Sequence, residues 1–166
     1  MRTLTFTVDC SLPPARVLEV AHDFDEGRGD VFPAVEADHY EVHSIGGNHA
    51  DVTEGTGTGI GTNWERCRYD WSTPGTVIAA VTDSNVYALG SSWTITAIDA
   101  PQGSRVEMTW AREFKHSVRG RLFGTAFRLA GRPVFGKYAR QVIDNLEALQ
   151  VRRSAATRAS APDGTT

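Results

Sequence analysis

The sequence predicts an α+β fold, in which a curved antiparallel β-sheet of six or seven strands wraps around a long C-terminal α-helix. Apolar residues alternate with polar ones over residues 39–115, a pattern typical of half-buried strands. Beyond residue 120 they recur at helical spacing instead. No helical segment separates the candidate strands, which favours an antiparallel meander over a parallel sheet. A short helix pair is expected after the first strand.

Length and composition set the first limits on organisation and partners. The chain has 166 residues and a formal net charge of −3, so we expect one domain over residues 1–150 and no nucleic-acid partner. Residues 151–166 are small and polar, and we expect them to form a disordered tail. No apolar run is long enough for a membrane span, and we expect no signal peptide because the N-terminal residues alternate instead of forming an apolar core. A cytoplasmic monomer or homodimer is therefore expected.

The N-terminal elements follow from two short patterns. Leu4, Phe6 and Val8 alternate with threonines, which predicts a strand over residues 2–9. Ser11 then offers an N-cap, and apolar residues over 17–24 recur at helical spacing. The Gly-rich stretch 27–30 ends this first helix, and a second short helical turn is expected over 31–35.

Six further strands are expected, separated by turn residues rich in Gly, Pro and Asn. Their ranges are 39–45, 49–54, 62–71, 76–83, 91–99 and 104–115. The glycines of residues 55–61 do not form a phosphate-binding loop, because no Gly-Lys-Ser/Thr follows and the next element is a strand. We interpret this run as a hairpin turn.

The C-terminal helix is expected to bury one apolar stripe against the sheet. Its first part places Leu122, Ala126 and Leu129 on one face, and Pro133 should kink the helix. The stripe then continues through Phe135, Tyr138, Val142, Leu146 and Leu149.

A curved sheet cannot press flat on a helix along its whole length, so an apolar ligand cavity is expected between them. Large aromatic residues on the strands favour this interpretation over a filled core, because small-molecule sites have apolar walls with few polar groups. Residues expected to bind the ligand are Tyr40, Val42, Tyr69, Trp93, Met108, Trp110, Phe114, Tyr138 and Val142.

Three polar residues are candidates for catalysis: Tyr69, Arg112 and His43. Arg and Tyr could polarise carbonyl groups or stabilise enolates. The alternative for Arg112 is a cross-strand salt bridge with Glu65, Glu107 or Glu113. A metal held by His39, Glu41 and His43 competes with a solvent-facing polar strand side, and the latter fits the alternation directly. We therefore expect neither a metal nor a cofactor.

The order of elements resembles the Bet v 1-like, or START-like (SRPBCC), superfamily with its helix-grip fold, and most closely its polyketide cyclase/dehydrase branch. The resemblance rests on the first strand leading into Pro13–Leu18, the Gly57–Thr62 turn, the strand end at Tyr69–Pro74 and the closing helix with Asn145–Leu149. It implies binding of a hydrophobic small molecule such as a lipid or polyketide. The alternative that it implies is a cofactor-free cyclase/dehydrase using acid–base chemistry.

Overall fold

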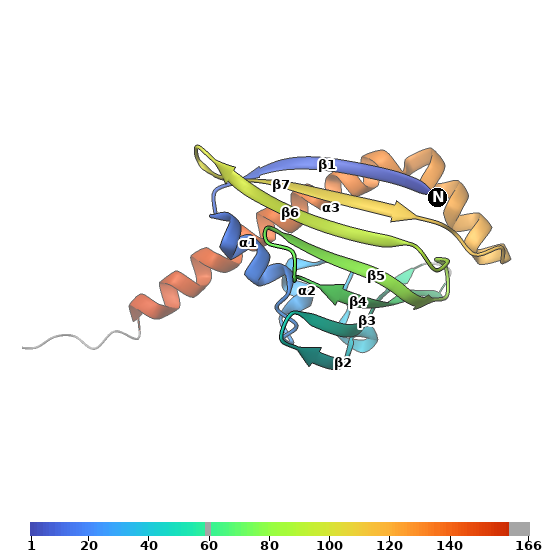
Figure 1. Ribbon diagram of the computed structural model, residues 1–166, viewed down its shortest axis with the longest axis horizontal. Helices are drawn as coiled ribbons and strands as arrows, with labels where there is room; N and C mark the ends of the chain where they lie inside the picture. The colour runs from blue at the N-terminus through green and yellow to red at the C-terminus, as the bar shows by residue number, and fades with distance from the viewer. Residues whose placement is uncertain (59–60, 160–166) are drawn as a thin grey trace, which may run out of the picture.

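The computed structural model describes residues 1–58 and 61–159. One seven-stranded antiparallel sheet carries all the strands, in the spatial order β1-β7-β6-β5-β4-β3-β2. The long helix α3 runs along the sheet beside β1 and β7 and continues past the sheet's end (Figure 1). The predicted helix-grip architecture is confirmed, including the short helix pair after the first strand.

The strands lie within a few residues of the predicted ranges. They are β1 Arg2–Cys10, β2 Glu41–Gly46, β3 His49–Thr58, β4 Gly61–Asp70, β5 Thr76–Ser84, β6 Ser92–Ala100 and β7 Gly103–Arg112. The helices are α1 Pro14–Ala21, α2 Arg28–Val31, the 3-10 turn η1 Ala37–His39, and α3 Val118–Ala159.

The register between β1 and β7 determines which of their side chains face the interior of the protein. Leu4 lies opposite Trp110 and Phe6 opposite Met108, so the apolar positions of both strands fall on one face, as period-two alternation requires. In β4 the pairing with β5 shifts between Arg66 and Cys67. Such an irregularity bends a strand and increases its local twist.

Helix α3 is longer than predicted at its C-terminal end. It spans 42 residues and remains helical through Pro133. Residues 151–159 are helical rather than disordered, which corrects that part of the predicted tail; residues 160–166 lie outside the described residues. Arginine and alanine favour this extension because both have high helix propensity. Arg153 also reaches Asp23 and Asp25 at 3.6 and 3.8 Å.

The first half of α3 buries a different face from the predicted one. Leu122 and Leu129 are 54% and 82% exposed, whereas Phe127 and Gly131 are buried. Both stripes have helical spacing, but the phenylalanine side offers more apolar area to the sheet. Gly131 also lets the helix approach the Leu4 side chain, where an added Cβ would be only 3.2 Å from its Cδ1 atom.

The helices close the interior by packing on the sheet and on one another. Helix α1 contacts β6 and β7, and α3 contacts β1 and α2. Ser11, between β1 and α1, donates hydrogen bonds from its backbone N–H and its hydroxyl to Glu147 of α3, at 2.6 and 2.7 Å. These contacts do not fill the space between α3 and the middle of the sheet's inner face, and the cavity lies there.

Candidate ligand-binding site

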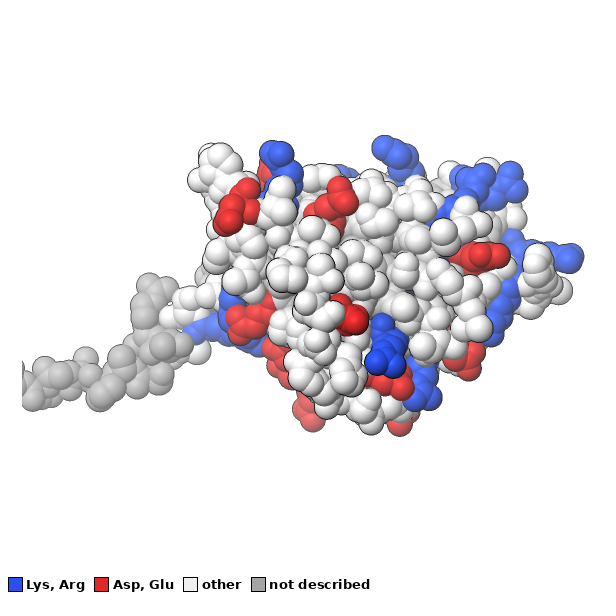
Figure 2. All heavy atoms as spheres, viewed as in Figure 1, with Lys and Arg blue, Asp and Glu red and all other residues white. Residues whose placement is uncertain are grey.

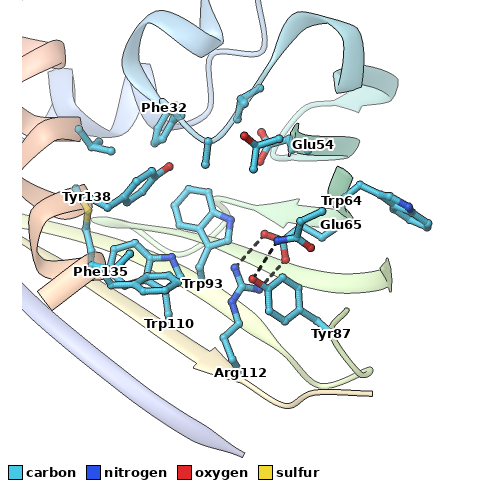
Figure 3. Close-up of a pocket in the computed structure, with 18 of the residues that line it drawn as sticks. Phe32, Glu54, Trp64, Glu65, Tyr87, Trp93, Trp110, Arg112, Phe135 and Tyr138 are labelled. Atoms are coloured by element: carbon cyan, nitrogen blue, oxygen red, sulfur yellow. Dashed lines mark hydrogen bonds and ion pairs between the residues drawn. The ribbon is translucent and has the colours of Figure 1, made fainter. Parts of the chain in front are cut away.

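A cavity of about 230 Å³ lies between the inner face of the sheet and α3. This is at the small end of the range of ligand pockets, roughly 300–1,000 Å³. Figure 3 shows side chains from the sheet, the α2 end and α3 converging on it. Its wall consists of Phe32, Ala34, Val35, Glu54, Gly55, Thr56, Asn63, Trp64, Glu65, Tyr87, Trp93, Ile95, Met108, Trp110, Arg112, Val134, Phe135, Tyr138 and Val142.

The apolar wall is a set of aromatic rings held by mutual contact. The ring of Trp110 on β7 lies 5.1 Å from that of Phe135 and 5.9 Å from that of Tyr138, both on α3 and both nearly perpendicular to it. Trp93 on β6 stands toward the middle of the cavity in Figure 3. Edge-to-face pairs such as these stabilise each ring's orientation, so the wall is largely formed before a ligand arrives.

The polar wall is built around Arg112, at the end of β7. Its two terminal nitrogens donate to the two oxygens of Glu65 at 2.6 and 2.9 Å (Figure 3). The ring of Tyr87 lies beneath the guanidinium, 4.3 Å from Cζ. Arg112 is only 4% exposed. Burial alone would lower the pKa of Arg112, but the Glu65 carboxylate outweighs it and holds the pKa above its ordinary value.

Two atoms of this polar wall lack a protein partner. Arg112 Nε and Asn63 Oδ1 are buried and make no hydrogen bond to the described residues. The side-chain amide of Asn63 instead donates to the Tyr87 hydroxyl at 3.5 Å, so the hydroxyl hydrogen of Tyr87 remains available for another acceptor. An unsatisfied buried polar group is costly. The hydrogen bonds of this donor and this acceptor are thus left to a partner other than the described residues.

A second buried ion pair lies at the other side of the cavity. Arg28 of α2 donates from Nε to Glu54 of β3 and from a terminal nitrogen to the Tyr69 hydroxyl, which in turn donates to Glu54 at 2.7 Å. The other terminal nitrogen donates to the backbone carbonyls of Ala21 and Asp23. Burial works against the charge of Arg28, yet Glu54 keeps its pKa above the ordinary value.

The tyrosines that face the cavity remain protonated. Burial raises the pKa of Tyr138 and of Tyr87 above the ordinary value. Such groups act as hydrogen-bond donors near neutral pH rather than as bases. In Figure 3 the Tyr138 hydroxyl points into the cavity, toward the side of Phe32 and Glu54.

Six residues predicted from the sequence do line the cavity: Trp93, Met108, Trp110, Arg112, Tyr138 and Val142. The predicted salt bridge between Arg112 and Glu65 forms as well, so the same arginine is both paired and part of the wall.

Tyr69 and His43, proposed beside Arg112 as catalytic groups, do not meet it in the cavity. Tyr69 is fully buried behind Glu54, and burial followed by the charge of Glu54 raises its pKa well above the ordinary value. His43 lies on the edge strand β2, with Nε2 2.8 Å from the Thr53 hydroxyl. Residues of β2 were expected to contact the ligand, but β2 is the edge strand of the sheet and does not line the cavity.

Three predicted ligand contacts also lie outside the cavity wall. Tyr40 and Val42 pack against the core at the β2 edge, and burial raises the pKa of Tyr40 to about 12. Phe114 follows the end of β7 and packs on Tyr87 and Phe127. These three residues lie near the ends of their strands. The prediction was wrong because alternation shows which face a residue is on but not which part of the sheet borders the cavity.

The structure does not align His39, Glu41 and His43 on one strand face, as the metal interpretation required, because His39 precedes β2. No three His, Cys, Asp or Glu side chains among the described residues are arranged to hold a metal ion. His39 lies in η1 with Nε2 3.2 Å from the Thr62 hydroxyl, and His43 contacts Thr53. A register shift between Val42 and Ser44 interrupts the strand that should have aligned them.

Sequence reasoning missed several wall residues, most notably Glu54, Asn63 and Tyr87. A signal for Glu54 exists in the sequence, because it shares strand parity with Ala50 and Val52, which are apolar. A carboxylate on the apolar face of a strand is a candidate for a site. Asn63 and Tyr87 carry no comparable pattern, since both lie beside turns.

The fold and an apolar cavity with a few polar groups define a helix-grip ligand-binding domain, and comparison with known proteins agrees. Residues 1–150 match the family described as "Polyketide cyclase / dehydrase and lipid transport". The chain belongs to this family. No curated protein matches the sequence.

Solved structures share the fold at low sequence identity. The Zhui aromatase/cyclase from Streptomyces sp. R1128 is 16% identical, with 99% of both chains covered and a TM-score of 0.71. TTHA0849 from Thermus thermophilus is 15% identical, covering 89% of this chain and 99% of that one, with a TM-score of 0.72. A START superfamily protein from Mycobacterium smegmatis is 11% identical, covering 89% and 98%, with a TM-score of 0.67.

Proposed function

We propose that the protein binds a hydrophobic small molecule whose polar end carries both a hydrogen-bond donor and an acceptor, such as a hydroxyl beside a carbonyl. The observation that carries this proposal is a pair of buried atoms on two residues of the cavity wall, Arg112 Nε and Asn63 Oδ1, which have no partner among the described residues. The ligand's acceptor would face Arg112 and its donor would face Asn63. Its apolar body would lie against Trp93 and Trp110.

Binding is favoured over catalysis by the state of the cavity's ionisable groups. Both carboxylates of the wall, Glu54 and Glu65, are paired with buried arginines, and the tyrosines are held protonated. A general base has to accept a proton, and either carboxylate could do so only by giving up its buried ion pair with arginine.

A cyclase or dehydrase activity is the second candidate, supported by the family and by the donors around Arg112. Arg112 Nε and the Tyr87 hydroxyl could polarise a carbonyl, while Glu65 would have to accept the proton. Incubation with a poly-β-ketone mimic tests this. Turnover that disappears in Glu65→Gln supports it, and binding without turnover supports the carrier function.

The test of binding is native mass spectrometry of the purified protein, followed by titration with a hydrophobic fluorescent probe. Val142→Phe fills the cavity from α3, and Asn63→Leu removes its acceptor while keeping the side-chain size. We expect Val142→Phe to abolish probe uptake and Asn63→Leu to weaken ligands that carry a hydroxyl. Ile98→Phe, on the exposed side of β6, is the control. Uptake unchanged in Val142→Phe would contradict the proposal.

A further inference from the structure

The first half of α3 has a composition unlike the rest of the chain. Residues 118–143 of α3 contain six of the 17 Lys and Arg residues and none of the 20 Asp and Glu residues. The chain as a whole is acidic, with a formal net charge of −3. Lys and Arg side chains accordingly gather at the end of the molecule where α3 begins (Figure 2). A surface of one sign on a chain of the opposite net charge indicates a partner of opposite charge.

This helix half also exposes an apolar ridge. Val118, Leu122 and Leu129 are 88%, 54% and 82% exposed, and their spacing of four and then seven residues places them on one line along the helix. The cavity does not use them, because the opposite side of the helix, with Phe127, faces the interior. The ridge is therefore an unpartnered face of a helix whose other face is already packed.

A row of arginines runs beside the ridge. Arg121, Arg128 and Arg132 repeat the spacing of seven and four residues, and all three are exposed. In the described part of the chain, no carboxylate lies within ion-pair distance of them. Long cationic side chains beside an apolar line can reach phosphate groups while their stems cover apolar surface.

We propose that this face of α3, the Leu122–Leu129 ridge with the Arg121–Arg128–Arg132 row, docks the protein on an anionic lipid surface. An amphipathic helix with Leu on one side and Arg on the other lies in the plane of a bilayer interface, and anionic lipid strengthens its binding. No helix of the described residues is long and apolar enough to cross a membrane. The association is therefore peripheral.

An acidic protein would be the other partner of matching charge, but the ridge fits lipid better. Protein interfaces concentrate aromatic and methionine anchors at their centre. Here the phenylalanines of the helix, Phe123, Phe127 and Phe135, are buried or half-buried on the other side. The ridge is a convex line of aliphatic side chains, which suits insertion among acyl chains.

The test is co-sedimentation of the full chain with vesicles of phosphatidylcholine alone and of phosphatidylcholine with phosphatidylglycerol. We expect binding only to the anionic vesicles, decreasing as salt rises. The ridge variant Leu122→Ser/Leu129→Ser and the row variant Arg121→Gln/Arg128→Gln/Arg132→Gln should each weaken partitioning by more than about tenfold.

Matched controls separate this face from general stickiness and net charge. Leu89→Ser/Ile98→Ser removes exposed apolar residues elsewhere, and Arg68→Gln/Arg105→Gln/Arg152→Gln removes the same number of exposed charges elsewhere. Thermal melting confirms that each variant is folded. Equal binding to neutral vesicles, or equal loss in the controls, would overturn the proposal. Absence of vesicle binding would also overturn it, and capture of polyglutamate in that case would assign the face to an acidic protein.

Discussion

Arg28 and Arg112 are both buried and both paired with a carboxylate that lines the cavity, but their surroundings differ. Every terminal nitrogen of Arg28 and its Nε has a partner, and the rings of Phe24 and Phe32 lie 4.6 and 4.5 Å from its Cζ. Arg112 bonds Glu65 with its two terminal nitrogens and leaves Nε unpartnered among the described residues.

This difference separates a structural ion pair from one available to a ligand. A buried polar network that is completely satisfied makes the fold rigid and specific. A buried donor without a partner lowers the stability of the fold, and a ligand that accepts its hydrogen bond removes this cost. The two pairs are alike in residue type, so their roles can be told apart only by counting hydrogen bonds.

The largest effect is expected from Arg28→Met, which leaves Glu54 charged and without its partner in the interior. Breaking a buried pair in this way should lower the free energy of unfolding by about 3–5 kcal/mol. Denaturant unfolding measures it. Arg66→Met is the control, because its partner Asp51 is partly exposed and exposed pairs contribute at most about 1 kcal/mol. Equal losses in the two variants would remove the distinction between buried and exposed pairs.

Arg112→Met should cost less stability, about 2–3 kcal/mol, because its nitrogens donate only to Glu65 among the described residues, whereas Arg28 also donates to Tyr69 and to two backbone carbonyls. Probe binding should fall strongly in this variant. The double variant Arg112→Met/Glu65→Met should recover most of the stability, since an apolar pair replaces an ion pair, but not the binding of polar-ended ligands. Unfolding and probe titration on the same samples decide the result. Recovered binding would show that Arg112 serves packing alone.

Trp110→Ala tests the apolar wall of the cavity, where Trp110 packs against Phe135 and Tyr138 of α3. Truncating a core Trp costs about 3–5 kcal/mol, but one side of Trp110 already borders the cavity, so we expect about 2 kcal/mol. Ligand affinity should fall more than stability. Parallel melting and binding curves measure both. A loss of about 3–5 kcal/mol in the free energy of unfolding, with unchanged ligand affinity, would show that Trp110 is a core residue and not a ligand contact.

The smallest effect is expected at Glu147, a half-buried carboxylate with neutral donors from Ser11 instead of an arginine. These hydrogen bonds lower its pKa below 4.5 in the folded state. Its charge therefore stabilises the fold above the unfolded pKa and stops doing so as pH falls through the folded pKa. Glu147→Gln should cost about 1 kcal/mol at pH 7, and this cost should disappear once the pH has fallen below the folded-state pKa of Glu147. If the variant remains less stable than the unmodified protein at low pH, the loss comes from packing and not from the charge of Glu147.

Much of the fold followed from periodicity, because alternation fixes both the number of strands and the side that each residue faces. The cavity wall was predicted where it lies on central strands, as for Trp93, Met108 and Trp110. Residues at the edge of the sheet, such as His43 and Tyr40, share the same alternation but lie away from α3. Alternation gives the face of a residue and not its distance from the helix.

Arg28 shows a second limit of the sequence. It lies between two glycines in a segment that we expected only to break a helix, yet it is 3% exposed. Long-range partners on β3 and β4 determine its burial, and no local pattern encodes them. The exposed stripe of α3 shows the same limit, because the helical spacing of Leu122 and Leu129 does not reveal which face meets the sheet.

The pairing of β1 with β7 joins Arg2 to Arg112, which are separated by about two-thirds of the 166-residue sequence. During synthesis, β1 emerges first and has to wait for most of the chain before its neighbour exists, and α3 follows later still. Contacts between such distant segments form slowly. Until then the newborn chain exposes an unpaired strand edge and an open apolar sheet face, which promote aggregation. The same topology that encloses the cavity thus leaves the unfinished polypeptide open to aggregation until β7 and α3 have been made.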